Sequence, residues 1–451
     1  MRAALRAARA VLRQEPECWL AYLHGRQLEN LPHLTRTPPR QVGAWRRVLL
    51  ALRFMVRDTR PGAGPAGRAR YLFYAGSANQ AHALEGTLTA LRRRGEEVVA
   101  LGLGHRSAGE AFPFRPFSVT DLLGGLWLLA TRLPVLWRQT REAHPLTRAW
   151  YFDLLCRCPI LLVHFHRLLR LHRPAVVVTS NDHSVDNRCL LAMAHQLGIA
   201  TVYCQHASVS PLFPALRVNV ALLDGAAALD TYRRCAVNRP PGPFSAPRPC
   251  VFLTGQKKAL PARASGPGIG IAVNTLDDTT RVRALLESLR GRPVILRWHP
   301  RQAAEQVADF KRILADTGGD FSDPSEQPVG DFLSRLRVLI AGDSSIHLEA
   351  ALAGVRPLYY PITPTDTDDY YGYVAAGVAN RARTPDELIA WLDQNRSRPA
   401  VDGDSPVRHY SHTFGTEWEG REGELAADIL QTIPDADRYP DLFGYQGPLR
   451  S

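Results

Sequence analysis

Short apolar runs alternate with helical patterns along most of the chain from Tyr71 onward. The clearest run, 175–179 (AVVVT), is nearly all β-branched, which is typical of a strand buried on both faces of a parallel sheet. The expected strands span residues 71–75, 97–101, 175–179, 200–204 and 218–223 in one block, and 270–273, 294–298, 338–341 and 357–360 in a second. Helical patterns separate most of these strands, so the chain predicts strand–helix–strand units and an α/β fold.

Two stretches rich in Pro and Gly, residues 238–249 and 261–268, divide this pattern. Polar residues gather where the strands end, and ligands of open parallel sheets bind outside the carboxyl ends of the strands. We therefore expect two doubly wound Rossmann-like domains facing a cleft, over residues 70–240 and 265–400. Residues 401–451 are expected to pack back toward the N-terminal domain.

The charge is concentrated at the N-terminus. The 451-residue chain has a net charge of +12, and residues 1–70 hold 14 arginines and four acidic residues, a net +10. Residues 1–14 predict an arginine-rich helix. Arginines recur along a second apolar stretch, at Arg46, Arg47, Arg53 and Arg57. We therefore expect a basic helical segment over residues 1–60, followed by a Gly/Pro-rich linker at 61–70.

Two interpretations of this basic segment carry equal weight: contact with an anionic membrane surface, and a solvated helix face. Nucleic acid is not expected as a partner, because no zinc-finger spacing or RNA-binding aromatic signature accompanies the charge. The N-terminus lacks the features of a secretory signal. The best apolar stretch, 122–131, is interrupted by Arg132 and is shorter than a bilayer span, so any membrane contact is expected to be peripheral.

Seven scattered cysteines indicate a reducing, cytoplasmic environment. Cys156 and Cys158 have no second pair at zinc-site spacing, and we interpret them as core or surface thiols. No cluster of histidines and carboxylates has the spacing of a metal site. We therefore expect no metal and no cofactor.

One candidate anion site is the sequence Gly342-Asp343-Ser344-Ser345, between a strand and a helix. Ser344 or Ser345 is a natural N-cap, and the free N–H groups at a helix N-terminus attract phosphate. Glu349 follows in the early turns of this helix. The alternative is a plain capping motif.

A second candidate is Arg297-Trp298-His299-Pro300-Arg301, at another strand end of the same block. Pro300 restricts His299 to extended geometry, and a histidine between guanidiniums can hold a phosphate through charge-assisted hydrogen bonds. Asn274 ends a further strand of this block. The alternative is a capped strand end with a surface histidine.

The first block offers candidates for acceptor binding and for a general base, which an acceptor hydroxyl needs. The candidate bases are Asp182, His183 and Asp224. The candidate acceptor-side residues are Ser77, Asn79, Gln205 and His206. Asp182 can equally be an N-cap for the helix that follows. A dehydrogenase and a P-loop enzyme are disfavoured, because neither glycine motif is present.

The pair His299-Pro300 and Ser344-Ser345 resembles the HP and SS motifs of bacterial sialyltransferases, polysialyltransferases and β-Kdo transferases of the GT-B type. A similar pair occurs in the CDP-glycerol glycerophosphotransferases of teichoic acid synthesis. Three further stretches resemble predicted capsule and surface-polysaccharide transferases: 180–225, 368–378 and 414–420. The resemblance covers residues 70–430 and implies a GT-B fold with a cytidine-nucleotide donor.

The resemblance also implies site roles. The histidine and serines bind the donor phosphate or nucleotide, which places this role on His299, Ser344 and Ser345. The sialyltransferases carry an acidic-acidic-Gly motif whose acid is the base. Leu223-Asp224-Gly225 lacks one acid, so Asp224 or Asp182 fills the role, and Asp182 is preferred because its strand is more apolar and looks more central.

The expected function is transfer of a sugar, such as sialic acid, Kdo or a related ulosonic acid, from a cytidine-nucleotide donor to a hydroxyl of a surface glycan or lipid-linked acceptor. A metal is not required, and the expected location is the cytoplasm, at the inner face of the cytoplasmic membrane. The alternatives are a CDP-polyol phosphotransferase, a nucleotide-sugar epimerase and a non-catalytic component of polysaccharide assembly.

Overall fold

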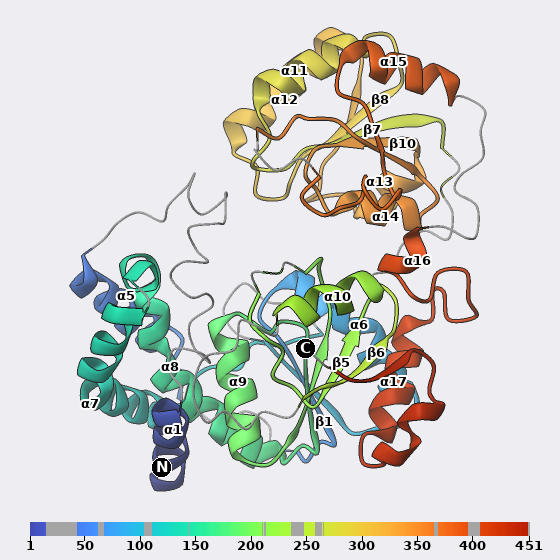
Figure 1. Cartoon of the computed structure of the whole chain (residues 1–451). Coiled ribbons are helices and arrows are strands. Elements are labelled where there is room, and N and C mark those ends of the chain that lie inside the picture. Colours follow the sequence, from blue (N-terminus) through green and yellow to red (C-terminus); the bar gives the residue numbers. More distant parts are fainter. Residues whose placement is uncertain are drawn as a thin grey trace. The chain divides into compact units, whose positions relative to one another are not determined.

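The chain divides into two units, drawn in Figure 1. Unit one comprises Met1–Lys257 and Arg421–Ser451, and unit two comprises Lys258–Gly420. The computed structural model describes residues 1–14, 43–61, 67–102, 111–143, 145–209, 211, 213–235, 248–257, 264, 266–364, 369–395 and 406–449. Each unit contains one sheet, so the expected fold class of two Rossmann-like α/β units is confirmed.

The sheet of unit one has seven strands in the order β13-β6-β5-β4-β3-β1-β2. They are β1 (Tyr71–Ala75), β2 (Val98–Gly102), β3 (Val176–Thr179), β4 (Ala200–Cys204), β5 (Val220–Leu223), β6 (Cys250–Leu253) and β13 (Tyr445–Pro448). All neighbours are parallel except β13, which is antiparallel to β6. After β1 the chain adds β2 on one side of β1 and then returns to add β3 on its other side. The strand order therefore reverses between β1 and β3.

Helices cover both faces of this sheet. They are α6 (Ala78–Arg93), α9 (Val185–Gln196), α10 (Ala226–Cys235) and α17 (Glu422–Thr432), followed by a 3-10 turn at Ala436–Asp441. The C-terminal helix α17 packs on α6, where a Cβ at Gly423 would lie 2.5 Å from the backbone of Gly86. Glycine is required at this crossing because the two backbones approach too closely for a side chain.

The N-terminal helices belong to the core of unit one. Figure 1 shows α1 (Arg2–Gln14), α5 (Ala44–Arg57), α7 (Val119–Ala143) and α8 (Pro145–His172) gathered together. Helix α1 buries one face against this group, through Ala4, Ala8, Val11 and Leu12. Helix α5 does the same through Val48, Ala51 and Met55. The segment is therefore no separate appendage, because helical spacing puts its apolar residues on one face of each helix.

The central helix α8 carries Cys156 and Cys158, and both are buried. Burial raises the pKa of the Cys156 thiol to about 12. These are core thiols. Cys18 lies outside the described residues.

Among the residues that the structure describes, one helix is long and apolar enough to cross a membrane by length and composition. This is the Val119–Arg138 part of α7, with a mean hydropathy of 1.3 and 33% of its apolar window buried. The finding corrects the expectation that no stretch reaches that length. Buried core helices also meet this criterion, and one face of α7 packs on α8.

The sheet of unit two has six parallel strands in the order β12-β11-β10-β7-β8-β9. They are β7 (Gly268–Ala272), β8 (Val294–Arg297), β9 (Asp320–Ser322), β10 (Leu336–Ala341), β11 (Arg356–Tyr359) and β12 (Asn380–Arg381). Here the order reverses between β7 and β10. Ile340 of β10 joins one apolar cluster and Leu339 joins another, so both faces of the sheet are covered.

The helices of unit two are α11 (Thr279–Ser288), α12 (Ala304–Thr317), α13 (Val329–Ser334), α14 (Ile346–Leu352), α15 (Pro385–Gln394) and α16 (Val407–Tyr410). The helix expected after Ser345 is α14, and it has only seven residues. The short strands β6, β9, β12 and β13 were not predicted.

The integration of α1 into the core predicts a difference between two alanines of the same helix. Ala8 is fully buried, whereas Ala3 is exposed. Ala8→Asp should lower the free energy of unfolding of unit one by at least about 3 kcal/mol, because it buries an unpaired charge. Ala3→Asp, the matched control, should leave it within about 0.5 kcal/mol. Urea denaturation measures both, and equal stabilities would show that α1 is not part of the core.

Candidate functional site

In unit one, the strand order reverses at the carboxyl ends of β1 and β3, and buried polar side chains connect the loops there. Gln80 of α6 accepts a hydrogen bond from the Gly76 amide (2.8 Å) and one from Asn187 Nδ2 (3.3 Å) at the same side-chain oxygen. The backbone carbonyl oxygen of Gln80 accepts a hydrogen bond from Ser180 Oγ at 3.0 Å. The side chain of Asn187 also bonds Thr179 and Ser184. This network fixes the loop that carries Asp182 and His183.

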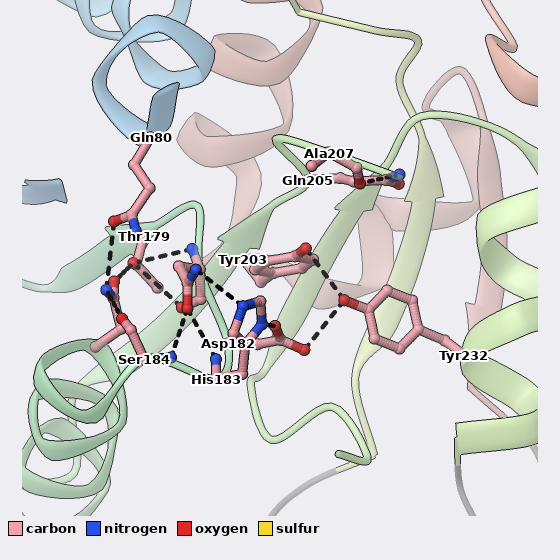
Figure 2. Close-up of polar contacts among 11 residues, drawn as sticks. Gln80, Thr179, Asp182, His183, Ser184, Tyr203, Gln205, Ala207 and Tyr232 are labelled. Atoms are coloured by element: carbon pink, nitrogen blue, oxygen red, sulfur yellow. Dashed lines mark hydrogen bonds and ion pairs between the residues drawn. The ribbon is translucent and has the colours of Figure 1, made fainter. Parts of the chain in front are cut away.

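Asp182 and His183 form a pair at this point. Figure 2 shows the Asp182 carboxylate between the His183 ring and the Tyr232 hydroxyl. His183 Nδ1 lies 2.8 Å from one oxygen of Asp182, and Tyr232 donates to the other at 3.0 Å. The Asp182 side chain is 4% exposed and that of His183 is 19% exposed. Only the histidine of this pair has substantial solvent access.

The electrostatics keep Asp182 ionised. Burial alone raises the pKa of this carboxyl, but the hydrogen bond and charge of His183, the bond from Tyr232 and the charge of Arg188 outweigh it, so the pKa is lowered. The ionised Asp182 accepts a hydrogen bond from Nδ1–H of His183. In the neutral form of the ring, this places the lone pair on Nε2. Nε2 has a long contact of 3.4 Å with Asn181 Nδ2. Asp182 therefore fixes the orientation of the His183 ring, as an aspartate does for the histidine of hydrolase triads.

Asp182 is not the N-cap of the following helix. The N-cap of α9 is Ser184, without a side-chain cap bond. Asn181 Oδ1 instead accepts from the His183 and Ser184 amides at 2.9 Å and 2.7 Å. Both oxygens of Asp182 thus serve the neighbouring side chains, and the capping alternative does not apply.

Asp224 lies at the end of β5, two strands from β3. Its carboxylate is 3.5 Å from Nζ of Lys257, a buried lysine that also donates to the Gly255 carbonyl at 3.1 Å. The Asp224 amide donates to Gln205 Oε1, and Gln205 Nε2 donates to the Ala207 carbonyl. Gln205 is thus part of the loop scaffold, and His206 beside it is half-buried.

Ser77 and Asn79 lie at the start of α6, and both are exposed. Ser77 is the N-cap of this helix, and its side chain accepts from the Gln80 amide at 3.4 Å. The loop before it runs close to α9, because a Cβ at Gly76 would lie 2.5 Å from Asp186. Ser77 and Asn79 therefore border the same reversal point as Asp182.

In unit two, the order reverses at the ends of β7 and β10, and a second network joins the loops. Asn274 Nδ2 donates to the Asp343 carbonyl at 3.1 Å. Asp277 accepts from the Asn274 amide (2.7 Å) and from the Thr363 hydroxyl (2.5 Å). Thr363 Oγ1 accepts in turn from the Asp343 amide at 3.0 Å. A Cβ at Gly342 would collide with Thr363, so glycine is required there.

Asp277 is buried, like Asp182, but its pKa is raised to about 6. Burial is the main cause, and the neighbouring Asp343 charge adds to it, while the bonds from Thr363 and Asn274 counteract it only partly. Sequence reasoning did not select Asp277. The signal available was an Asx-type spacing after a strand, Asn274-Thr275-Leu276-Asp277, which is common in turns.

His299 follows β8, within a turn closed by the Gln302 amide and the His299 carbonyl at 2.8 Å. Its Nδ1 accepts a bond from the Arg301 amide at 3.1 Å. Burial and the Arg301 charge lower its pKa, which favours the neutral imidazole. A neutral ring that accepts at Nδ1 carries its proton on Nε2 and presents it as a donor. Pro300 and Arg301 are exposed beside it.

Arg297 is the last residue of β8. Its guanidinium donates to Ser322 Oγ at 2.7 Å and to the Gln327 carbonyl at 2.9 Å. These contacts tie β8 to the loop after β9, and a contact of Arg297 with phosphate stays a prediction. Glu349 is buried within α14, and its charge acts on Arg297.

Ser344 and Ser345 begin α14. Ser344 Oγ accepts a long bond from the Ile346 amide at 3.4 Å, and Ser345 is the N-cap residue without a side-chain cap bond. The Ser344 bond is a capping contact, whereas the Ser345 side chain makes no cap bond. Behind it, His347 Nε2 bonds the Gly342 carbonyl at 3.0 Å, and burial lowers the His347 pKa to about 4. This neutral histidine holds the loop in place from within.

The loop that begins at Asp369 also reaches the site. The Tyr370 amide donates to Asp343 Oδ1 at 3.1 Å, and the Tyr370 side chain is 42% exposed. Asp369 has a φ of 62°, a strained value for a residue with a side chain, and its carboxylate accepts from the Val374 and Ala375 amides. Tyr370 was not predicted as a site residue, although it lies within the stretch that resembles polysaccharide transferases.

The described residues contain no group of three or more His, Cys, Asp or Glu side chains arranged to hold a metal ion. Metal independence stays a prediction.

No protein-family model matches the sequence, and no curated protein matches it. Similar solved structures include MurG from Acinetobacter baumannii, with a TM-score of 0.46, 11% identity, and coverage of 82% of this chain and 100% of that chain. A UDP-GlcNAc 2-epimerase from Neisseria meningitidis bound to UDP-GlcNAc has a TM-score of 0.48, 13% identity, and coverages of 80% and 99%. The glycotransferase of kitacinnamycin has a TM-score of 0.44, 12% identity, and coverages of 82% and 99%. A likeness of this degree concerns the architecture alone.

The raised pKa of Asp277 predicts a pH-dependent stability. An unfolded aspartate titrates near 3.8 and the folded one near 6, so the folded state binds the proton more tightly and stability falls as the pH rises between these values. Asp277→Asn should remove this loss. Urea denaturation gives the free energy of unfolding of both proteins at each pH. The value for the wild type, minus that for Asp277→Asn, should be lower at pH 7 than at pH 4.5. Asp316→Asn, at an exposed position, is the control, and parallel curves for wild type and Asp277→Asn would contradict the assignment.

Proposed function

We propose that this protein is a glycosyltransferase that uses a cytidine-nucleotide sugar. The observation that carries the proposal is the set of polar side chains at the carboxyl ends of β8, β7 and β10, which are His299, Asn274, Ser344 and Ser345. These strands are neighbours in the sheet, and strands lie about 4.8 Å apart. The loops with His299 and Ser345 are therefore about 10 Å apart, with Asn274 between them, which suits a nucleotide phosphate.

The donor phosphate is bound by neutral donors in this proposal. His299 offers Nε2–H, and Ser345 offers its hydroxyl, with Ser344 beside it. Arg301, exposed next to His299, supplies positive charge to the leaving group. Such preorganised donors stabilise charge that develops in the transition state. Tyr370 is a candidate platform for the base, because an exposed aromatic ring stacks on any nucleobase.

The preference for cytidine rests on the resemblance of the HP and SS pair to the sialyltransferase-type motifs. With a sialic acid, Kdo or related donor, the leaving group is CMP. The acceptor is a hydroxyl of a surface glycan or glycoconjugate. The proposed site of action is the cytoplasm, at the inner face of the membrane.

Unit one supplies the base. Asp182 holds His183 with its lone pair on Nε2, so His183 accepts the proton of the acceptor hydroxyl while the hydroxyl oxygen forms the bond to the anomeric carbon. The bond from the anomeric carbon to the donor phosphate breaks, and its electron pair leaves with CMP. Asp182 is a positioning residue that stabilises the imidazolium. Asp224 is paired with Lys257 and is the weaker candidate.

Nucleotide binding is tested first by thermal shift with CMP, CDP, UDP and GDP. A nucleotide at a hundredfold excess over its Kd stabilises a protein by about 2.7 kcal/mol, which for a unit of this size is a rise in Tm of roughly 5–10 °C. We expect CMP or CDP to give this rise and His299→Ala and the Ser344→Ala/Ser345→Ala double variant to lose it.

Ser288→Ala, in α11, is the matched control and should keep the full shift. A rise with UDP alone would contradict the cytidine preference, and no rise with any nucleotide would contradict donor binding. Product mass then separates sugar transfer from transfer of a polyol phosphate, and isomerisation of a UDP-sugar without an acceptor would indicate an epimerase. Binding of a donor without turnover would indicate a non-catalytic component.

The role of His183 is tested by kinetics. His183→Gln should lower kcat about 10²–10⁴-fold, the usual contribution of a general base, with an unchanged Tm shift from nucleotide. Asp182→Asn should lower kcat as well, because it loses the ionised partner that sets the tautomer. His82→Gln, an exposed histidine of α6, is the control, and full activity in His183→Gln would exclude it as the base.

A further inference from the structure

Helix α7 exposes an apolar stripe. Val119, Leu123, Trp127 and Trp137 are 50%, 56%, 41% and 37% exposed. The remaining exposed positions before Arg138 are Thr120, Ala130, Thr131 and Pro134. This face therefore presents no charge over five turns of helix, with two tryptophans at its surface, which is unusual for a helix that borders water.

The adjoining helix α1 exposes arginines. Arg2, Arg6 and Arg13 are exposed and Arg9 is half-buried, at helical spacing along one side. The Arg9 guanidinium lies 4.1 Å from the centre of the Trp127 ring, so the arginine stripe of α1 meets the apolar stripe of α7 at this point.

Acidic side chains are withdrawn from this surface. Helix α1 contains none, and Asp121, in the first turn of α7, is 1% exposed. Asp121 bonds His164 and Arg167 of α8 at 3.0 Å and 2.9 Å. Burial raises its pKa, but these bonds outweigh burial and lower it well below the usual value. The described surface of the two helices is thus apolar and cationic.

Helix α5 also exposes both apolar and arginine side chains. Its exposed side chains include Trp45, Leu49, Leu50 and Val56, with Arg46 and Arg53 among them. It packs on α8, as α7 does.

We propose that the α1/α7 face docks on an anionic lipid bilayer. Apolar and aromatic side chains enter the interface while arginines contact lipid phosphates, the pattern of a helix that lies in the membrane plane. Helix α7 does not span the bilayer, because its other face, from Asp121 to Leu136, is part of the core of unit one. The docking surface is thus a face of the folded unit one and no detachable basic segment, and docking does not depend on the proposed enzyme activity.

The test is co-sedimentation of the full-length chain with phosphatidylcholine vesicles, with and without phosphatidylglycerol. The wild type should bind the anionic vesicles and be released by salt. Arg2→Gln/Arg6→Gln should lower the partition coefficient about 25-fold, or about fivefold for each charge lost. Leu123→Gln/Trp127→Gln should lower it at least about tenfold, through lost apolar burial. Circular dichroism checks that both variants are folded.

Matched controls come from unit two. Phe321→Gln, at a position 38% exposed, and Arg312→Gln, at an exposed position, should bind as the wild type does. Three results would overturn the proposal. The first is equal vesicle binding by the wild type and the α7 variant. The second is resistance of the bound protein to alkaline extraction, which indicates a spanning helix. The third is concentration-dependent dimerisation that Leu123→Gln/Trp127→Gln abolishes, without any vesicle binding. Nucleotide binding is read separately, so failure here leaves the proposed function untouched.

Discussion

The structure depends on the point in each sheet where the strand order reverses. The connections that follow the two strands at this point run in opposite directions, so a crevice is left between the loops at the carboxyl ends of these strands. Buried backbone groups there must still be paired. In unit one, Gln80 and Asn187 satisfy the loops, and in unit two Asp277 and Thr363 do so. The need to pair these buried backbone groups thus gathers polar side chains at the two reversal points.

The two reversal points have opposite electrostatics despite similar burial. Desolvation raises the pKa of both Asp182 and Asp277. At Asp182 a histidine, a tyrosine hydroxyl and a nearby arginine more than offset it. At Asp277 the partners are a threonine and a backbone amide, and the nearest charge is another carboxylate. Environment decides the protonation behaviour of a carboxyl group. The Asp182 carboxyl is held ionised beside His183, whereas the Asp277 carboxyl binds its proton more tightly than an ordinary aspartate does.

The sequence predicts the strands and their polar ends well, because buried parallel strands and the residues that follow them have distinct compositions. It does not predict which side chains meet across the sheet. Lys257 is 33 residues from Asp224, and Thr363 is 86 from Asp277. Asp182 was preferred as the base because its strand looked central, yet β3 and β5 are equally far from the centre of the seven-stranded order. What distinguishes Asp182 is the reversal point, which only topology shows. The short strands β9 and β12 escaped prediction because two or three residues carry no periodicity.

The N-terminal charge shows a similar limit to what composition can predict. A count of arginines cannot separate those that face inward from those that face outward. Arg47 is 5% exposed and bonds Asp153 of α8 at 3.0 Å, so it contributes to the interior. Arg2, Arg6 and Arg13 are exposed to solvent instead, on the same side of α1 as Arg9, which contacts Trp127 of α7. Because α1 and α5 bury their apolar faces in the core, unit one holds these outward arginines on a rigid framework. A rigid surface loses less conformational entropy on docking than a flexible basic tail does. Membrane contact by such a surface therefore requires fewer charges, and it cannot be removed by trimming the terminus without disturbing the fold.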